Sequence, residues 1–233
     1  MERIKFLLVI LIILFTQQAF AQKVSNVDFD DIKAKTHDST SVYYYPFLLK
    51  RFQIFDTTLT SIDLNYIYYG NVFDPTYNPY NESKDEEKFK EFVKAKKYVE
   101  AIPFGISVFN ENPVNMKVLH DLIVCYDKTG NQSIAQKYAN RYFSLLDVIY
   151  RSGNGMGLNT AYVVIKVPDE YEILGDMGLQ ITKQTLVQDV DVLTINTKLQ
   201  TPAKGEKKVK ELHFNVRMPL LHLHQQFKTE SKQ

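Results

Sequence analysis

Three carboxylates follow Pro168 in the sequence, at Asp169, Glu170 and Glu172. Paired carboxylates can act as general acid and general base when their surroundings separate their pKa values. Neighbouring residues of a loop or strand end point apart, so we predict a solvated acidic loop at this place. A weak cation site is the alternative, although the stretch lacks the ligand spacing of an EF-hand.

Two histidines near the C-terminal end, His222 and His224, are separated by a single residue. In an extended strand both imidazoles lie on one face, which suits metal ligation. His213 precedes His222 by nine residues, an odd offset that turns it to the opposite face of a continuous strand. No further ligand can be named, so we predict partly buried imidazoles, no metal site and no cofactor.

Tyrosine and phenylalanine are concentrated early in the chain. Of the 15 Phe and 15 Tyr residues, twelve fall between Tyr43 and Tyr80. Tyrosine combines an apolar ring with a hydroxyl group, which suits stacking on a sugar or gripping a peptide, but aromatic rings are also ordinary core material. We favour the core interpretation and keep the following as candidate ligand-binding residues: Tyr66, Tyr68, Tyr69, Tyr77, Tyr80, Arg151, Asp169 and Glu170.

The glycine-rich stretch Arg151–Gly157 resembles a phosphate-binding loop. Such a loop needs a strand before it and a helix after it, whereas here the predicted order is the reverse. The stretch therefore predicts a flexible turn. Ser152 is not surrounded by the G-x-S-x-G elbow that would activate a serine nucleophile. The single cysteine, Cys125, lies within an apolar helical segment, which is typical of a buried thiol. No catalytic residue can be named, and an enzyme is the less favoured reading.

The overall composition excludes several classes of protein. The chain has 233 residues, of which 45% are hydrophobic, which is enough for one or two small domains and too much for a disordered chain. Lys and Arg number 28 against 27 Asp and Glu, so no global field attracts nucleic acid or anionic lipid.

Residues 22–150 have a helical pattern that must position the tyrosines. Ser25, Pro46 and Thr60 or Ser61 are predicted to start helices, and Gly70 to end one. Phe92 and Tyr126 are 34 residues apart, as are Ala101 and Ala135. This period, with a small residue where two helices cross, predicts a layer of tetratricopeptide-like hairpins completed by the upstream helices.

Residues 151–227 have the period of strands and must position the carboxylates and histidines. The predicted strands are 161–167, 178–187, 190–197 and 208–218, and 228–233 form a polar tail. Leu212 and Phe214 alternate with polar residues, so one face of the sheet must pack on the helices. The sequence therefore predicts an α+β fold with a small antiparallel β-sheet against an N-terminal helical layer.

Several stretches occur in a recognisable order: Tyr43–Pro46, Asp56–Leu59, Tyr66–Gly70, Tyr77–Tyr80, Arg151–Gly155, Asp169–Tyr171, Gln184–Val187 and Leu212–Asn215. Together they resemble the DUF4919 family of secreted bacteroidete proteins, and the resemblance covers nearly the whole mature chain. The resemblance implies a Gram-negative source and assigns no catalytic residue.

The first 21 residues have the layout of a secretory signal peptide. Arg3 and Lys5 precede the apolar run Phe6–Phe15, and Ala19–Ala21 provides a cleavage site. A run of ten apolar residues is too short to span a membrane. We expect an exported protein, periplasmic or extracellular, cleaved after Ala21 and without a membrane span thereafter.

These observations favour a non-enzymatic binding or scaffold protein whose helical surface receives a protein or peptide partner of the cell envelope. Two alternatives remain open. One is an envelope hydrolase that uses Asp169, Glu170 or Glu172 with a histidine at the helix–sheet junction. The other is a sugar-recognition module built on the Tyr43–Tyr80 belt.

Overall fold

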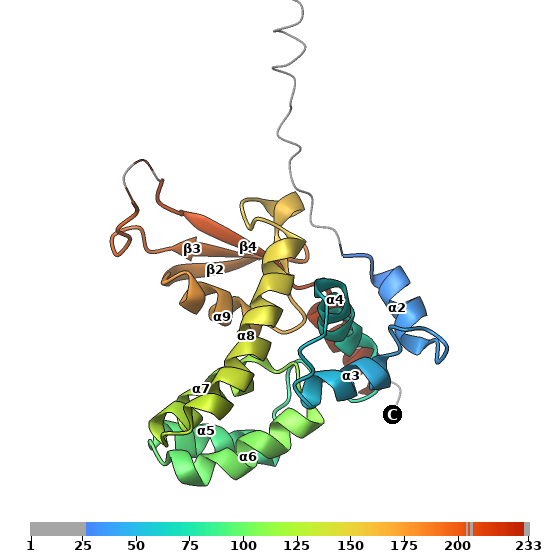
Figure 1. Cartoon of the computed structure of the whole chain (residues 1–233). Coiled ribbons are helices and arrows are strands. Elements are labelled where there is room, and N and C mark those ends of the chain that lie inside the picture. The colour runs from blue at the N-terminus through green and yellow to red at the C-terminus, as the bar shows by residue number, and fades with distance from the viewer. Residues whose placement is uncertain (1–26, 204, 206, 231–233) are drawn as a thin grey trace, which may run out of the picture.

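The structure is a computed structural model that describes residues 27–203, 205 and 207–230 (Figure 1). The predicted signal peptide and Ser25 lie outside these residues. The α+β fold class is confirmed: helices precede a four-stranded sheet. No helix in the described part of the chain is long and apolar enough to cross a membrane.

The first three helices of the described residues lie on the right of Figure 1. They are α2 (Phe29–His37), α3 (Tyr45–Gln53) and α4 (Ser61–Gly70). Asp28 caps α2, Pro46 stands in the first turn of α3, and Thr60 and Asp63 form a reciprocal capping box at α4. The predicted helix starts at Pro46 and Thr60 are thus confirmed, as is the end of α4 at Gly70. The short 3-10 helix η1 (Asn71–Phe73) follows it.

Two helical hairpins follow and repeat each other closely. The first joins α5 (Lys84–Lys94) to α6 (Tyr98–Glu111), and the second joins α7 (Met116–Lys128) to α8 (Gln132–Ser152). Phe92 and Tyr126 each stand two residues before the end of the first helix, and Ala101 and Ala135 each occupy the fourth position of the second helix. Both alanines are buried.

The turns of the two hairpins also match after 34 residues. Lys96 and Gly130 both have positive φ, at 58° and 79°. The next amide in each turn donates back to a matching carbonyl: Lys97 to Phe92 at 2.9 Å and Asn131 to Tyr126 at 2.8 Å. The internal repeat predicted from the sequence is therefore a repeat of backbone geometry.

A glycine sets the spacing between the hairpins. A Cβ atom added at Gly105 of α6 would lie 2.7 Å from side-chain atoms of both Leu122 and Phe89. We therefore expect Gly105→Ala to lower the free energy of unfolding by roughly 1–3 kcal/mol, because the packed side chains must shift. Urea denaturation followed by far-UV circular dichroism measures this loss.

Gly175 provides the matched control for this substitution. It is exposed and helical, and a Cβ atom there meets nothing within 4 Å. Gly175→Ala should leave stability unchanged or raise it by up to about 1 kcal/mol. Equal effects of the two substitutions would contradict the close approach at Gly105.

The sheet has the strand order β1-β4-β3-β2 and follows α8 in the chain. Its strands are β1 (Tyr162–Val163), β2 (Ile181–Val187), β3 (Val190–Ile195) and β4 (Glu211–Asn215). β2, β3 and β4 pair antiparallel, whereas β1 pairs with β4 in parallel. The sheet is therefore mixed, and the prediction of an antiparallel sheet is wrong at this edge. A two-residue strand carries too short a pattern to reveal its direction.

Two helices lie where the sequence pattern predicted loop or strand. They are α9 (Pro168–Asp176) and α10 (Arg217–Glu230); the 3-10 helix η2 (Leu158–Thr160) also precedes β1. Pro168 begins α9 instead of ending a strand, because proline suits the first helical turn. The side chain of Asn215 accepts the Arg217 amide at 3.0 Å, and Pro219 stands in the first turn of α10. The strand predicted over 208–218 therefore ends at Asn215.

One core joins the helices to the sheet. Leu145 and Ile149 of α8 and Leu193 and Phe214 of the sheet are completely buried in the same hydrophobic cluster. Figure 1 shows α8 running from the two hairpins up to the sheet, with α9 beneath the sheet. This arrangement brings α9 to the boundary between the two layers.

Candidate functional site

The three carboxylates of α9 point to three different parts of the molecule. Asp169 contacts α4, Glu170 lies near β3, and Glu172 contacts α7 and α8. All three are buried, with exposed fractions of 3%, 0% and 7%. The predicted solvated acidic loop is therefore wrong: the residues form a helix whose carboxylates are inside the protein.

Asp169 is held by a tyrosine of the aromatic belt. The Tyr68 hydroxyl donates to Oδ2 of Asp169 at 2.6 Å and accepts the Ile165 amide at 3.4 Å. Tyr77 reaches the same segment, donating to the Ile165 carbonyl at 2.5 Å. Burial raises the pKa of Asp169 from 3.8 to about 7, so that its neutral and charged forms are both populated near neutrality.

Glu170 lies beside a second buried carboxylate, Asp191 of β3. No donor in the described part of the chain reaches either oxygen of Glu170. Asp191 accepts from the Gln184 amide at 2.8 Å. Burial and the nearby Asp191 raise the pKa of Glu170 from 4.5 to about 9. Glu170 is therefore protonated at neutral pH, and a protonated Glu170 can donate to Asp191.

Glu172 forms a polar triad with the helical layer. Its Oε2 atom contacts Nδ1 of His120 at 3.0 Å and accepts from the Tyr142 hydroxyl at 2.9 Å. Although burial opposes it, these contacts lower the pKa of Glu172. The Glu172 contact in turn raises the pKa of His120. His120 and Glu172 are 52 residues apart and share no motif, so no signal in the sequence identified this pair.

Among the described contacts, none of the C-terminal histidines forms a hydrogen bond or ion pair with the carboxylates of α9. His213 contacts the Gly155 carbonyl through Nδ1 at 3.1 Å. His222 lies on α10, bonded to Gln226 and edge-on to Tyr77, and His224 is exposed two positions further along the helix. The hydrolase arrangement with a C-terminal histidine therefore finds no support. Within the described residues, no three His, Cys, Asp or Glu side chains are placed to hold a metal ion.

A polar groove lies beside Asp169. We give this name to two cavities, of about 450 Å³ and 80 Å³, that share Asn81, Glu82, Glu86 and Lys166. Their walls come from the loop before α5, the first turns of α5 and α7, the end of α6, and the start of α9. Segments far apart in the sequence thus form one concave polar surface.

Most charges in the polar groove are already paired. Lys90 forms ion pairs with Glu82 and Glu86, and Lys117 forms one with Asp121. Glu86 also accepts from the Asn115 amide at 3.1 Å. Lys166 differs from these lysines: it lines both cavities and forms no ion pair or hydrogen bond through its ammonium group with the described residues.

An unpaired acceptor lies in the same cavity as Lys166. The side-chain oxygen of Asn112 is buried and has no hydrogen-bond partner within the described part of the chain. Buried polar atoms are nearly always hydrogen-bonded in native proteins. The larger cavity is therefore lined by one residue with an unpaired ammonium and one with a buried, unpaired oxygen; a peptide or another polar ligand can satisfy both when the Asn112 side chain turns toward the cavity.

Among the other candidate residues, only Tyr80 lines the polar groove. Tyr66 donates to Asp31 at 2.6 Å, and Tyr69 donates to the Val163 carbonyl at 3.1 Å. Arg151 pairs with Asp147 on the exposed side of α8. Tyr80 is 39% exposed and lines the smaller cavity with Asp169. The remaining candidates, Tyr68, Tyr77 and Glu170, lie buried close to Asp169 and around α9.

The glycine-rich stretch after α8 is a structural turn. The Asn154 and Gly155 amides both donate to the Thr160 carbonyl, at 2.9 and 2.8 Å. A Cβ atom at Gly153 would lie 2.3 Å from the Ala161 carbonyl oxygen. The stretch therefore brings the chain from α8 back to β1.

The single cysteine, Cys125, is buried in α7, and burial raises its pKa to about 11.

The comparisons with known proteins identify a family but no characterised relative. Neither the curated proteins nor the solved structures contain a match to this chain. The family DUF4919, described as a domain of unknown function, matches residues 30–224. This match includes every helix from α3 to α9, all four strands and both cavities of the polar groove, so the chain belongs to the DUF4919 family.

Proposed function

We propose that this protein is a non-enzymatic binding protein that holds a segment of a partner protein in the polar groove. The observation that carries the proposal is a pair of residues lining the larger cavity whose polar groups have no partner among the described residues: Lys166 at its ammonium and Asn112 at its buried side-chain oxygen. A peptide backbone supplies a carbonyl to accept from the Lys166 ammonium and an amide to donate to the Asn112 oxygen.

The repeated hairpins support the same function. Their 34-residue repeat is the basis for a tetratricopeptide-like interpretation, which stays part of the proposal. Stacked helical hairpins offer concave surfaces that receive extended segments. The groove adjoins these hairpins, since the first turns of α5 and α7, the first helices of both hairpins, contribute to it.

The contacts of α9 support binding over catalysis. Glu170 and Glu172 are directed to Asp191 and to His120 and Tyr142 inside the protein. Tyr68 and Tyr69 are completely buried, so their rings are closed to a sugar. Export to the periplasm or beyond, which the N-terminal pattern predicts, is part of this proposal and makes an envelope protein the expected partner.

Selection from a displayed library of random peptides tests the proposal. Peptides that bind the full chain should lose at least about tenfold in affinity on Lys166→Glu, which corresponds to roughly 1.4 kcal/mol. Asn112→Leu should weaken the same peptides, because it removes the free acceptor. Isothermal titration calorimetry with each selected peptide measures both losses.

Lys183→Glu is the matched control, since Lys183 is an exposed lysine on β2 and outside the groove. Its peptide affinities should equal those of the unmodified protein. Selected peptides that bind Lys166→Glu and Asn112→Leu as tightly as the unmodified protein would contradict a peptide-binding groove.

A further inference from the structure

A third cavity lies between the α3–α4 loop and α8 and shares no residue with the polar groove. Its volume is about 320 Å³. The loop contributes Phe55 and Asp56, and α8 contributes Lys137, Asn140 and Arg141. The helical spacing of 137, 140 and 141 places these three side chains on one face of α8.

Arg141 is a buried cation that forms no ion pair with a carboxylate in the described part of the chain. It is 6% exposed, and its guanidinium stacks over the rings of Phe52 and Phe55. Nε donates to the Phe52 carbonyl and Nη2 to the Asp56 carbonyl, both at 2.9 Å. Nη1 donates to no acceptor, and no Asp or Glu forms an ion pair with Arg141, among the described residues. Buried arginines are usually paired with an anion, so this one is unusual.

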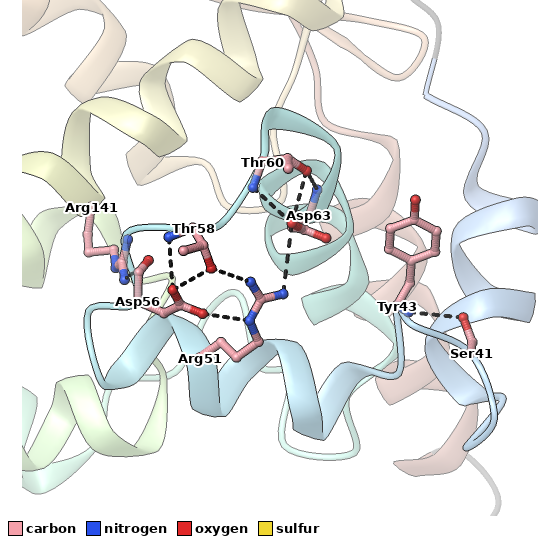
Figure 2. A network of polar contacts seen from close by, with 8 residues as sticks. All are labelled: Ser41, Tyr43, Arg51, Asp56, Thr58, Thr60, Asp63 and Arg141. Atoms are coloured by element: carbon pink, nitrogen blue, oxygen red, sulfur yellow. Dashed lines mark hydrogen bonds and ion pairs between the residues drawn. The ribbon is translucent and has the colours of Figure 1, made fainter.

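Asp56, the acidic residue of this cavity, is already neutralised from the other side. Its Oδ2 atom contacts Nε of Arg51 at 2.7 Å, and its Oδ1 atom accepts from the Thr58 amide and hydroxyl at 2.8 and 2.7 Å. Arg51 also approaches Asp63 at 3.9 Å. Figure 2 shows this network, with Arg51 on the carboxylate of Asp56 and Arg141 near the backbone of the same residue.

The charges around the cavity therefore leave one positive charge in excess. Arg51, Lys137 and Arg141 supply three positive charges against the two negative charges of Asp56 and Asp63. Lys137 is exposed and forms no ion pair with the described residues. The Asn140 side-chain oxygen accepts from Gln136, which leaves its NH₂ group as a further donor.

We propose that this cavity binds a carboxylate group, held by Nη1 of Arg141, the ammonium of Lys137 and the side-chain NH₂ of Asn140. Nη1 can donate a charge-assisted hydrogen bond to a carboxylate oxygen, and one excess positive charge balances one negative charge. The volume exceeds that of a carboxylate alone, so the ligand carries an organic group as well. A free small acid and the C-terminus of a peptide share this chemistry.

Thermal denaturation of the full chain in sodium acetate and in sodium chloride, at equal ionic strength, tests the proposal. Acetate should raise Tm in a saturable manner, and amide resonances of residues 55–57 and 137–144 should shift with the same concentration dependence. Lys137→Ala should raise the half-saturating acetate concentration by about fivefold, since it removes one of two cations. Lys94→Ala, at an exposed lysine of α5, is the matched control and should change nothing.

Two peptide probes distinguish the sources of the carboxylate. N-acetylglycylglycine should bind and its C-terminal amide should not. Tighter binding of this acid than of acetate identifies a peptide C-terminus, and equal binding identifies a small acid. Two results would overturn the proposal: no acetate-dependent change in Tm or resonances, or the same response in Lys137→Ala. Arg141 would then serve only to cap the carbonyls at the end of α3.

Discussion

The protein is expected to lose stability steadily as the pH rises from about 5 to 9, mainly because of Glu170. Burial and the nearby Asp191 raise the pKa of Glu170 in the folded state from 4.5 to about 9. Below pH 4.5 both the folded and the unfolded states are protonated, so the stabilising effect is complete. Between these values only the folded state keeps the proton, and each pH unit lowers the free energy of unfolding by up to about 1.4 kcal/mol.

Two further groups, Asp169 and His120, also lower the free energy of unfolding as the pH rises, and Glu172 has the opposite effect. Asp169, with its pKa raised to about 7, adds to the loss between pH 4 and 7. His120, with a raised pKa, adds to the loss as the pH rises through its folded value. The pKa of Glu172 is lowered, so its stabilising effect is lost instead as the pH falls below 4.5. The decline above pH 5 is therefore the net expectation.

Glu170→Gln should flatten this profile and make the protein more stable than the unmodified chain at pH 9. The amide is neutral at every pH and can donate to Asp191. Urea denaturation at a series of pH values measures the effect, and Glu211→Gln, at an exposed position of β4, is the control. A stability that rises with pH between 5 and 9, or a Glu170→Gln profile parallel to that of the unmodified protein, would contradict a buried protonated Glu170.

Tyr68→Ala is the substitution expected to destabilise the fold most. The Tyr68 ring is completely buried, and its hydroxyl joins Asp169 of α9 to the Ile165 amide. Truncating a buried aromatic side chain costs about 3–5 kcal/mol, and here it also leaves Asp169 without its donor. Denaturation at pH 6 measures the loss.

Tyr68→Phe separates the two contributions. It keeps the ring and removes the hydroxyl, so it should cost about 1–3 kcal/mol, and it should raise the pKa of Asp169 because a donor to the carboxylate is lost. Tyr44→Phe, at a tyrosine without a hydroxyl partner among the described residues, is the control and should be neutral. A loss below about 1 kcal/mol for Tyr68→Ala would show that α9 does not depend on this contact.

Local sequence signals predicted the helical layer well. Pro46 and Thr60 start helices because proline and a capping hydroxyl satisfy the first turn without any tertiary partner. The residues that recur after 34 positions are Phe92 with Tyr126 and Ala101 with Ala135. Within each hairpin these residues lie close to the turn, so their signal is also local. These features depend on backbone geometry that each segment sets by itself.

The features that the sequence did not predict depend on distant contacts. The strand predicted over 161–167 stops at Pro168, but a proline is equally suited to begin a helix such as α9. Only burial between the two layers decides between these alternatives. His120 meets Glu172 across 52 residues. The groove around Lys166 draws on the α5 region, the α6–α7 connection and the start of α9, so no single stretch reveals it.

Nuclear magnetic resonance mapping of the isotope-labelled full chain with a library-selected peptide tests the binding function most directly. We predict that the shifted amide resonances cluster in three segments: 76–86, 108–117 and 166–169. These peptide-induced shifts should be lost together in Lys166→Glu, while the rest of the spectrum stays unchanged. Resonance shifts confined to other segments, or shifts that persist undiminished in Lys166→Glu, would contradict a binding site in the polar groove.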